Sequence, residues 1–462
     1  MKFTRKQTAA FGLGAVGKDM VYALSASYVL YYYQDILGLP AAFVGLILMI
    51  ARIFDAVNDP FRGIVVAKTN SRWGRFRPWL FTGTVLNAFV LYFLFAAPDI
   101  SGAPLMVWFS ALYILWGVTY TMMDIPYWSM IPAVTTEPKE RESLSVVGRT
   151  CAAFGNALIT VFTLMAVSAL GSGSERAGFA RLAMIIAVFF IVAEMILVAS
   201  IEEKRSEKTA SSGTIREMFS ALMHNDQAMV TVISIVLINS AMYITTNLII
   251  YFFKYDFGGE NWIGNYTLFN MVGGLGQIAG MMILYPFIHT KLSNQTIFKG
   301  ALIVSMAGYL SIMTVCLTGL GHVLPLLCGL GLLVFCASGV LIVLTTVFLS
   351  GSVDYGEMKT GRREESVIFS MQTFVVKAAS GLSVFIAGLG ISLIGLKGNA
   401  DQTAVVTEVQ SAGTILGLRL LMTLLPMFGL VAAMIIFTKY FKLTDERMNE
   451  IAGQLKERHY NS

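Results

Sequence analysis

The sequence predicts an all-helical membrane protein of about twelve transmembrane helices, and three observations lead to this fold class. Hydrophobic residues make up 56% of the 462-residue chain, whereas charged residues make up only 13%. A soluble domain usually carries about 25% charged residues. The apolar residues also fall into long runs, and a bilayer-spanning helix needs about 20 of them. These features argue against a secreted enzyme, a nucleic-acid-binding protein and a disordered scaffold.

The predicted spans follow one another along the whole chain. Barrel strands would alternate in polarity over about ten residues, so the length of the runs favours helices. The runs lie at residues 10–35, 41–67, 79–98, 104–131, 148–170, 179–201, 228–250, 262–287, 297–318, 322–349, 368–395 and 411–438.

Basic residues between the spans predict the orientation of the chain. An even number of spans places both termini on one side, and the loops of that side contain most of the lysines and arginines. The opposite loops contain only Arg176, Arg181, Lys254 and Lys397. Cytoplasmic loops are enriched in Lys and Arg, so both termini are expected to be cytoplasmic.

A polar stretch after the sixth span divides the chain into two halves. We expect an N-terminal six-helix half at 1–200, a cytoplasmic middle loop at 201–227, a C-terminal six-helix half at 228–440 and a cytoplasmic tail at 441–462. Two six-helix halves are the arrangement of the major facilitator fold, which binds its substrate near mid-membrane between the halves.

Polar residues of the second span form a candidate cation site. Ionisable residues inside a membrane span are costly, so they are functional candidates. Asp55, Asn58 and Asp59 lie at i, i+3 and i+4 and share one helix face. With the hydroxyl of Thr121 in span four, they offer oxygen ligands that suit a hard cation, or a proton in its place. Alternatively, the two carboxylates only neutralise Arg52 and other bases.

A second group of polar residues suits a polyhydroxylated solute. These residues are Asp19, Asp124, Trp128 and Arg149 in the first half, and Gln372, Thr373 and Lys377 in the second. Ionised groups make strong hydrogen bonds to hydroxyls, and an indole ring can stack on a sugar. The alternatives are an interface aromatic for Trp128 and ordinary interhelical hydrogen bonds for Gln372 and Thr373.

No enzyme motif competes with these candidates. The four histidines lie in or near predicted loops or chain ends, without the spacing of a metal site. The sequence has no Walker loop, so ATP-driven transport has no support. Uphill transport would therefore draw on an ion gradient.

Eight motifs between residues 11 and 377 carry a resemblance to a known transporter family. They are FGLGAVGKD (11–19), YYYQDILGL (31–39), ARIFDAVNDP (51–60), SRWGRFRPW (71–79), YILWGVTYTMMDIPYWSMIP (113–132), KERE (139–142), SVDYGE (352–357) and SMQTFVVK (370–377). By these motifs the chain resembles the glycoside–pentoside–hexuronide:cation symporters of the major facilitator superfamily, and most closely the melibiose permeases.

The resemblance implies three sets of functional residues. The coupling-cation site would consist of Asp55, Asn58, Asp59 and Thr121, with Asp124 bordering both sites. The sugar-binding residues would be Lys18, Asp19, Asp124, Trp128, Arg149, Ala152, Gln372, Thr373, Val376 and Lys377. The cytoplasmic gate would consist of Arg141, Glu142, Asp354, Glu357 and Arg363.

The resemblance also implies what the protein binds and where it acts. The expected partners are a small sugar, a monovalent coupling cation (Na+, Li+ or H+) and the lipid bilayer, without nucleic acid. Na+ at the cation site would be the only metal, and no cofactor is expected. The expected location is the bacterial cytoplasmic (inner) membrane, as a multi-pass protein, with a monomer as the working expectation.

Five positions depart from the melibiose-permease pattern. Ile342 replaces an aromatic near the sugar, and Ala26 replaces a tyrosine, so both weaken the case for melibiose itself. Gly351 replaces an acidic gate residue, and Asn70 replaces a basic one. Arg62 stands where a small or apolar residue is usual. It either leans toward the cation carboxylates or extends to the cytoplasmic interface, as long basic side chains do, and we favour the second reading.

The predicted function is cation-coupled symport of a sugar by alternating access, with a galactoside such as melibiose as the expected substrate. The first alternative is a symporter of the same family for another glycoside, a pentoside or a glucuronide. A lipid or drug transporter of the same superfamily is a remote alternative, because the polar inward faces do not suit a lipid-open cavity. A sensor would need a soluble output domain, and a membrane-embedded enzyme would need a nucleophile–base pair. The sequence predicts neither, so both functions are disfavoured.

Overall fold

The structure, a computed structural model, describes residues 4–69, 71–134, 138–201, 223, 225–360, 365–397, 410–444, 446–448, 450–451 and 453–454. In these ranges it contains thirteen α-helices and one isolated β-bridge, between Ser71 and Gly74. Eleven helical segments there are long and apolar enough to cross a membrane. The predicted all-α membrane fold is therefore confirmed.

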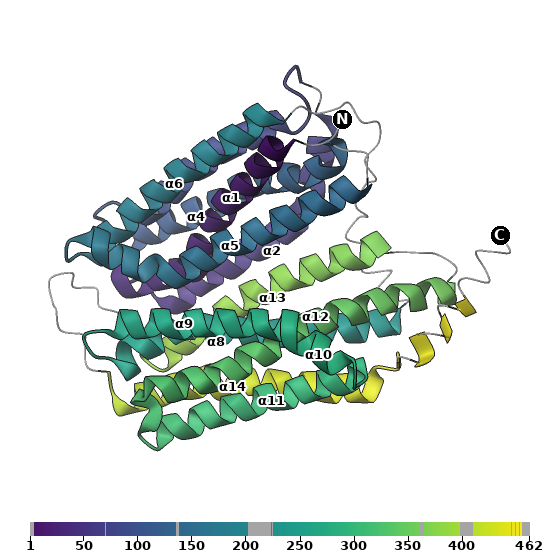
Figure 1. Ribbon diagram of the computed structural model, residues 1–462. Coiled ribbons are helices and arrows are strands. Elements are labelled where there is room, and N and C mark those ends of the chain that lie inside the picture. The colour runs from purple at the N-terminus through teal and green to yellow at the C-terminus, as the bar shows by residue number, and fades with distance from the viewer. Residues whose placement is uncertain are drawn as a thin grey trace. The chain divides into compact units, whose positions relative to one another are not determined.

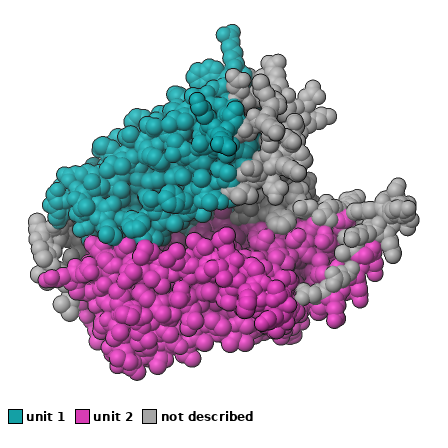
Figure 2. Space-filling view, in the orientation of Figure 1, with its two compact units in different colours: residues 1–211, 397–408 teal, residues 212–396, 409–462 magenta. Residues whose placement is uncertain are grey.

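The chain divides into two compact units (Figure 2). One comprises residues 1–211 and 397–408, and the other comprises residues 212–396 and 409–462. Most of the predicted middle loop lies outside the described residues, as does half of the predicted C-terminal tail.

Each unit is a bundle of long helices that run alongside one another (Figure 1). The first unit contains α1 (Arg5–Tyr31), the π-helix η1 (Tyr32–Ile36), α2 (Ala41–Lys68), α3 (Arg77–Phe95), α4 (Ala103–Val134), α5 (Pro138–Gly171) and α6 (Glu175–Ser200). The second contains α8 (Asp226–Tyr251), the π-helix η2 (Phe252–Phe257), α9 (Trp262–Ala279), the π-helix η3 (Gly280–Leu284), α10 (Tyr285–His289), α11 (Asn294–Leu317), the 3-10 helix η4 (Leu320–His322), α12 (Leu324–Thr360), α13 (Glu365–Leu393) and α14 (Ala412–Tyr440).

The two units share one packing pattern. In the first unit α1 packs against α5 and α6, and in the second α8 packs against α13 and α14. Likewise α4 contacts α2 and α3, and α12 contacts α9 and α11. The contact of α3 with α6 corresponds to that of α11 with α14. Each unit is thus one copy of the same six-helix arrangement, as expected for the halves of a major facilitator protein.

The observed helices extend beyond several predicted spans. α5 begins ten residues before the predicted span 148–170, and α12 ends at Thr360, eleven residues after the predicted span 322–349. An apolar run marks only the part of a helix that lies in the hydrocarbon core of the bilayer. The helix itself continues as long as its backbone hydrogen bonds continue. α1 is not among the eleven apolar segments, because Lys18, Asp19 and several hydroxyl-bearing residues lower its hydropathy.

Corresponding π-helical turns end the first helix of each unit. The turn after α1 has the sequence YYQDI, and the turn after α8 has the sequence FFKYDF. In the second unit Asp256 of η2 accepts hydrogen bonds from Nε (2.7 Å) and Nη2 (2.6 Å) of Arg419 in α14. Arg419 Nη1 also donates to the carbonyl oxygen of Cys316 in α11 (2.7 Å). This arginine therefore ties together three elements of the second unit.

Glycine permits a close contact between α1 and α5 in the first unit. A methyl group added at Gly155 of α5 would lie 2.5 Å from the carbonyl oxygen of Val16 in α1 and 3.0 Å from its Cα. Backbone atoms cannot give way as a flexible side chain can, so a residue larger than glycine would push α1 and α5 apart. Because α1 also carries Lys18 and Asp19, this contact helps to set the position of the candidate site.

We expect Gly155→Ala to lower the free energy of unfolding by about 1–3 kcal/mol, the usual range for overpacking. Gly329→Ala in α12 is the matched control, because no atom lies within 4 Å of the added methyl group. The control should be neutral or stabilising by up to about 1 kcal/mol, since alanine favours helix more than glycine does. Thermal unfolding in detergent checks both variants, and equal stability of the two would contradict the role of Gly155.

Candidate functional site

A buried lysine joins the two predicted sugar-site carboxylates of the first unit. The ammonium group of Lys18 in α1 donates to Asp19 Oδ2 (2.9 Å) and to Asp124 Oδ1 of α4 (2.7 Å). The Lys18 side chain is 3% exposed, whereas those of Asp19 and Asp124 are 19% and 28% exposed. The lysine is therefore inaccessible to a ligand, whereas the two carboxylates keep accessible surface.

Aromatic and basic groups surround this cluster. The Lys18 ammonium lies 5.0 Å from the ring centre of Trp128 in α4, and the Arg149 guanidinium of α5 lies 4.1 Å from the same ring. Such distances are those of cation–π contacts, which hold cations against an indole face. Ala152, the remaining predicted sugar residue of this unit, is buried on α5. The structure thus brings the charged and aromatic members of the N-terminal set into one cluster.

The predicted cation residues lie on facing helices of the same unit. Asp55 is buried on α2, and Asn58 and Asp59 are half-buried on the same helix. The Asp55 carboxylate lies against the backbone of α4, where a methyl group added at Gly117 would be 2.7 Å from Oδ2. The Thr121 hydroxyl donates to the carbonyl oxygen of Gly117 (2.9 Å). Gly117 therefore belongs to the surroundings of the site, although no sequence pattern predicted it.

Arg62 also reaches this site, so the favoured prediction that it extends to the cytoplasmic interface was wrong. Its Nη1 lies 3.4 Å from the carbonyl oxygen of Gly117 and donates to it. With the Asn58 amide turned so that its oxygen faces Arg62, that oxygen accepts from Nε (3.1 Å) and Nη2 (2.8 Å). The hydrogen-bond partners favour this amide orientation. The Arg62 charge also acts on the carboxylates of Asp55 and Asp59.

Arg52, the other arginine of α2 near the site, lies against two aromatic rings. Its guanidinium lies 4.9 Å from the ring centre of Tyr22 and 5.8 Å from that of Trp116. The sequence left open whether the two carboxylates only neutralise nearby bases. In the structure, Arg62 is the base that donates hydrogen bonds to the Asn58 amide oxygen and the Gly117 carbonyl oxygen of the candidate cation site.

Glu194 of α6 is a buried carboxyl group outside the predicted site residues. It is fully buried, and neither carboxyl oxygen has a hydrogen-bond partner in the part of the chain that the structure describes. A methyl group added at Gly14 of α1 would lie 3.2 Å from its Oε1, and the charges of Lys18 and Asp124 act on it. The signal was present in the sequence as a single glutamate inside the apolar run 179–201.

The C-terminal candidates lie on one helix of the second unit. Gln372, Val376 and Lys377 are half-buried residues of α13, and the side chain of Thr373 lies outside the described residues. Gln372 and Val376 are four residues apart and so share a face. Their role in sugar binding stays a prediction.

The gate predictions fall partly outside the described residues. This applies to Arg363 and to the side chains of Arg141 and Glu142. Asp354 and Glu357 lie in the last two turns of α12, and Glu357 is buried. Among the departures from the family pattern, Asn70 is also outside the described residues, whereas Ile342 is 38% exposed on α12.

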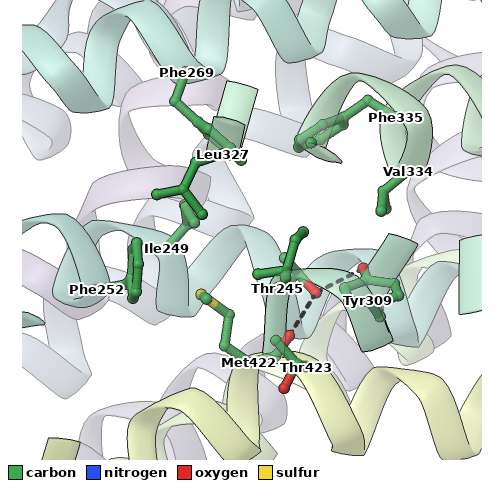
Figure 3. A pocket seen from close by; sticks show the side chains of 12 residues that line it. Thr245, Ile249, Phe252, Phe269, Tyr309, Leu327, Val334, Phe335, Met422 and Thr423 are labelled. Atoms are coloured by element: carbon green, nitrogen blue, oxygen red, sulfur yellow. Dashed lines mark hydrogen bonds between the residues drawn. The ribbon is translucent and has the colours of Figure 1, made fainter. Parts of the chain in front are cut away.

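A small pocket inside the second unit does not suit a sugar (Figure 3). Its lining is mostly apolar and includes Ile249, Phe269 and Phe335. The hydroxyl groups of Thr245 and Tyr309 lie 2.8 Å apart and hydrogen-bond to each other. A sugar would leave several hydroxyl groups there without partners, which is costly in an apolar cavity. The pocket is better explained as a packing gap.

Three curated proteins are similar to the chain over nearly its whole length. It is 26% identical to the uncharacterized symporter YjmB of Bacillus subtilis (strain 168), covering 99% of this chain and 96% of the relative. It is 26% identical to an isoprimeverose transporter of Lactiplantibacillus pentosus, covering 96% and 90%. It is 28% identical to a raffinose carrier protein of Pediococcus pentosaceus, covering 96% and 70%.

Solved structures with the same fold are transporters as well. A bacterial homolog of the human lysosomal transporter Spinster, in an inward-facing conformation, has a TM-score of 0.66 at 13% identity, covering 94% of this chain and 95% of the other. The xylose transporter XylE of E. coli has a TM-score of 0.59 at 12% identity, covering 96% and 98%. At these identities the likeness shows the fold alone.

The family described as MFS/sugar transport protein matches residues 10–445. This match covers nearly the whole chain and both units, and the named relatives are transporters rather than enzymes. The chain belongs to the MFS/sugar transport protein family.

Proposed function

We propose that the protein is a symporter that carries a glycoside across the bacterial inner membrane together with a monovalent cation, by alternating access between its two units. Both termini would face the cytoplasm, as the distribution of basic residues predicts. The proposal combines the family with the chemistry of the charged cluster in the first unit. Raffinose, lactose and isoprimeverose in the names of relatives support a sugar as substrate.

The Lys18–Asp19–Asp124 cluster is the observation that carries this proposal. The two carboxylates are fixed by one buried ammonium group, yet each keeps part of its surface exposed. Carboxylates accept strong hydrogen bonds from hydroxyl groups, and Trp128 beside them offers a flat apolar face. A sugar presents hydroxyl groups at its edges and an apolar face on its ring, so the cluster suits a sugar better than a lipid.

α4 provides a physical link between the sugar cluster and the cation residues. Asp124 contacts Lys18. Thr121, three residues earlier on the same face, donates to the carbonyl oxygen of Gly117, whose Cα faces the Asp55 carboxylate. A shift of α4 by either ligand would alter the geometry of the other site. Coupling of this kind is reciprocal and typically amounts to about 1–3 kcal/mol.

The identity of the sugar is the finer part of the proposal. We propose a galactoside such as melibiose first, because the N-terminal motifs follow the melibiose-permease pattern. Another glycoside, a pentoside or a glucuronide is the second candidate, because Ile342 and Ala26 replace aromatic residues of that pattern. An aromatic lost from a pocket removes a stacking surface and so changes which ring fits.

Uptake by proteoliposomes tests the proposal directly. We expect one or more radiolabelled sugars from a panel of galactosides, xylosides and glucuronides to accumulate above equilibrium when a cation gradient is imposed. A proton gradient and a sodium gradient are imposed separately, and an ionophore that collapses the gradient should abolish accumulation. Equilibration without accumulation for every sugar and both gradients would contradict symport.

Cysteine substitutions separate the two parts of the site. Asp59→Cys should abolish accumulation while sugar exchange across the membrane continues, because the cation residues are altered and the sugar cluster is intact. Asp19→Cys should instead lose sugar binding at least tenfold, because it removes an accepting carboxylate from the cluster. Measurements of sugar exchange and of equilibrium sugar binding check the two variants. If both variants fail in the same assays, the division into two sites is wrong.

A further inference from the structure

Arg62 occupies part of the candidate cation site with its own positive charge. It lies four residues after Asn58 and three after Asp59, so the three residues lie on one face of α2. Its guanidinium is half-buried and donates to the Asn58 amide oxygen through Nε (3.1 Å) and Nη2 (2.8 Å). Through Nη1 it donates to the Gly117 carbonyl oxygen of α4 (3.4 Å). Each of the three guanidinium nitrogens therefore makes a contact inside this site.

A sodium or lithium ion would need the oxygen atoms that Arg62 contacts. Small hard cations are held by oxygen ligands, from carboxylates and from neutral amide, hydroxyl and carbonyl groups. Here the Asn58 amide oxygen faces N–H donors, and the Gly117 carbonyl oxygen accepts from both Arg62 and Thr121. An incoming metal ion would have to break these hydrogen bonds before it could use the same oxygens.

The charge of Arg62 opposes a second cation in the same place. The guanidinium acts electrostatically on both Asp55 and Asp59 and so supplies the attraction that a bound metal ion would supply. It remains protonated at all physiological pH values. A second positive ion beside it would meet repulsion that offsets part of the attraction of the two carboxylates, and it would find its neutral ligands engaged.

We propose that the Arg62 guanidinium is a resident cation of the Asp55–Asn58–Asp59 site and excludes Na+ and Li+, so that sugar transport is independent of both ions. The inference rests on the proposed symport, and it removes two of the three coupling ions considered, leaving the proton. It also explains why position 62 carries an arginine where the melibiose-permease pattern has a small or apolar residue. An arginine takes the place of a metal ion that the remaining residues are otherwise suited to bind.

Direct binding of 22Na+ to purified protein in detergent tests the inference without knowledge of the sugar. Wild type should show no saturable binding above that of Asp59→Cys. Arg62→Met, which keeps length and removes charge, should gain saturable sodium binding. Adding Asp59→Cys to Arg62→Met should remove the gain. Arg72→Met is the control, because Arg72 is exposed outside the site, and it should behave as wild type does.

Two results would overturn the proposal. One is saturable, Asp59-dependent sodium binding by wild type. The other is a folded Arg62→Met that binds no more sodium than wild type does. If Arg62→Met does not fold, Arg62→Gln replaces it, since its amide keeps a donor and removes the charge.

Uptake separates this inference from the proposed function. Wild type should accumulate sugar under a proton gradient at a rate that changes less than twofold when sodium replaces choline. Arg62→Met should show a rate that increases at least fivefold with sodium. Lack of accumulation under any gradient would contradict symport but leave the sodium-binding result intact. Accumulation driven by sodium alone in wild type would support symport and overturn the role of Arg62.

Discussion

A full charge inside a membrane helix must be paired or hydrated, and the first unit meets this constraint through Lys18. An isolated lysine at the centre of a span costs about 2.5–3.5 kcal/mol on insertion scales. Lys18 is almost completely buried, and its ammonium contacts two carboxylates on two helices. Removing one partner of a buried ion pair typically costs about 3–5 kcal/mol. The relative position of α1 and α4 in this unit is therefore tied to the same contacts that present Asp19 and Asp124 to a ligand.

Close contacts between helices at glycine residues determine the positions of the charged side chains in the first unit. Gly155 lets α5 contact the backbone of α1 at Val16, and Gly117 lets the Asp55 carboxylate lie against α4. A side chain at Gly155 would clash with the backbone of the helix that carries Lys18 and Asp19, and one at Gly117 would clash with the Asp55 carboxylate. Small residues at such contacts are typical of membrane helices, because no hydrophobic force drives helices together within lipid. Packing and site chemistry in this unit thus depend on the same few glycines.

The sequence predicted the fold class and most of the N-terminal cluster, because long apolar runs and the few ionisable residues inside them stand out in the sequence. Long apolar runs define spans, and the spacing of Asp55, Asn58 and Asp59 defines a helix face. Helix ends were less predictable, as α12 shows, because polar turns can continue a helix beyond the apolar run. Gly117 was missed because its contribution is a backbone carbonyl and the lack of a side chain. Neither feature distinguishes it from other glycines in a sequence.

The spacing of Arg62 along α2 did not determine the direction in which its side chain points. Its position placed it on the face of Asp59, yet a long side chain can point along the helix in either direction. The choice depends on which acceptors lie within reach, and one of them belongs to α4, 55 residues further along the chain. Such an acceptor appears only when the helices are packed.

The proposed role of Arg62 as a resident cation would also limit how an ion gradient can drive transport. A transported ion must bind on one side of the membrane and leave on the other in each cycle. The Arg62 guanidinium is covalently attached and stays charged, so it cannot carry energy from a gradient. In the proposed symport, a driving force would therefore enter through groups that change charge during the cycle, such as the carboxyl groups of this unit, rather than through the arginine.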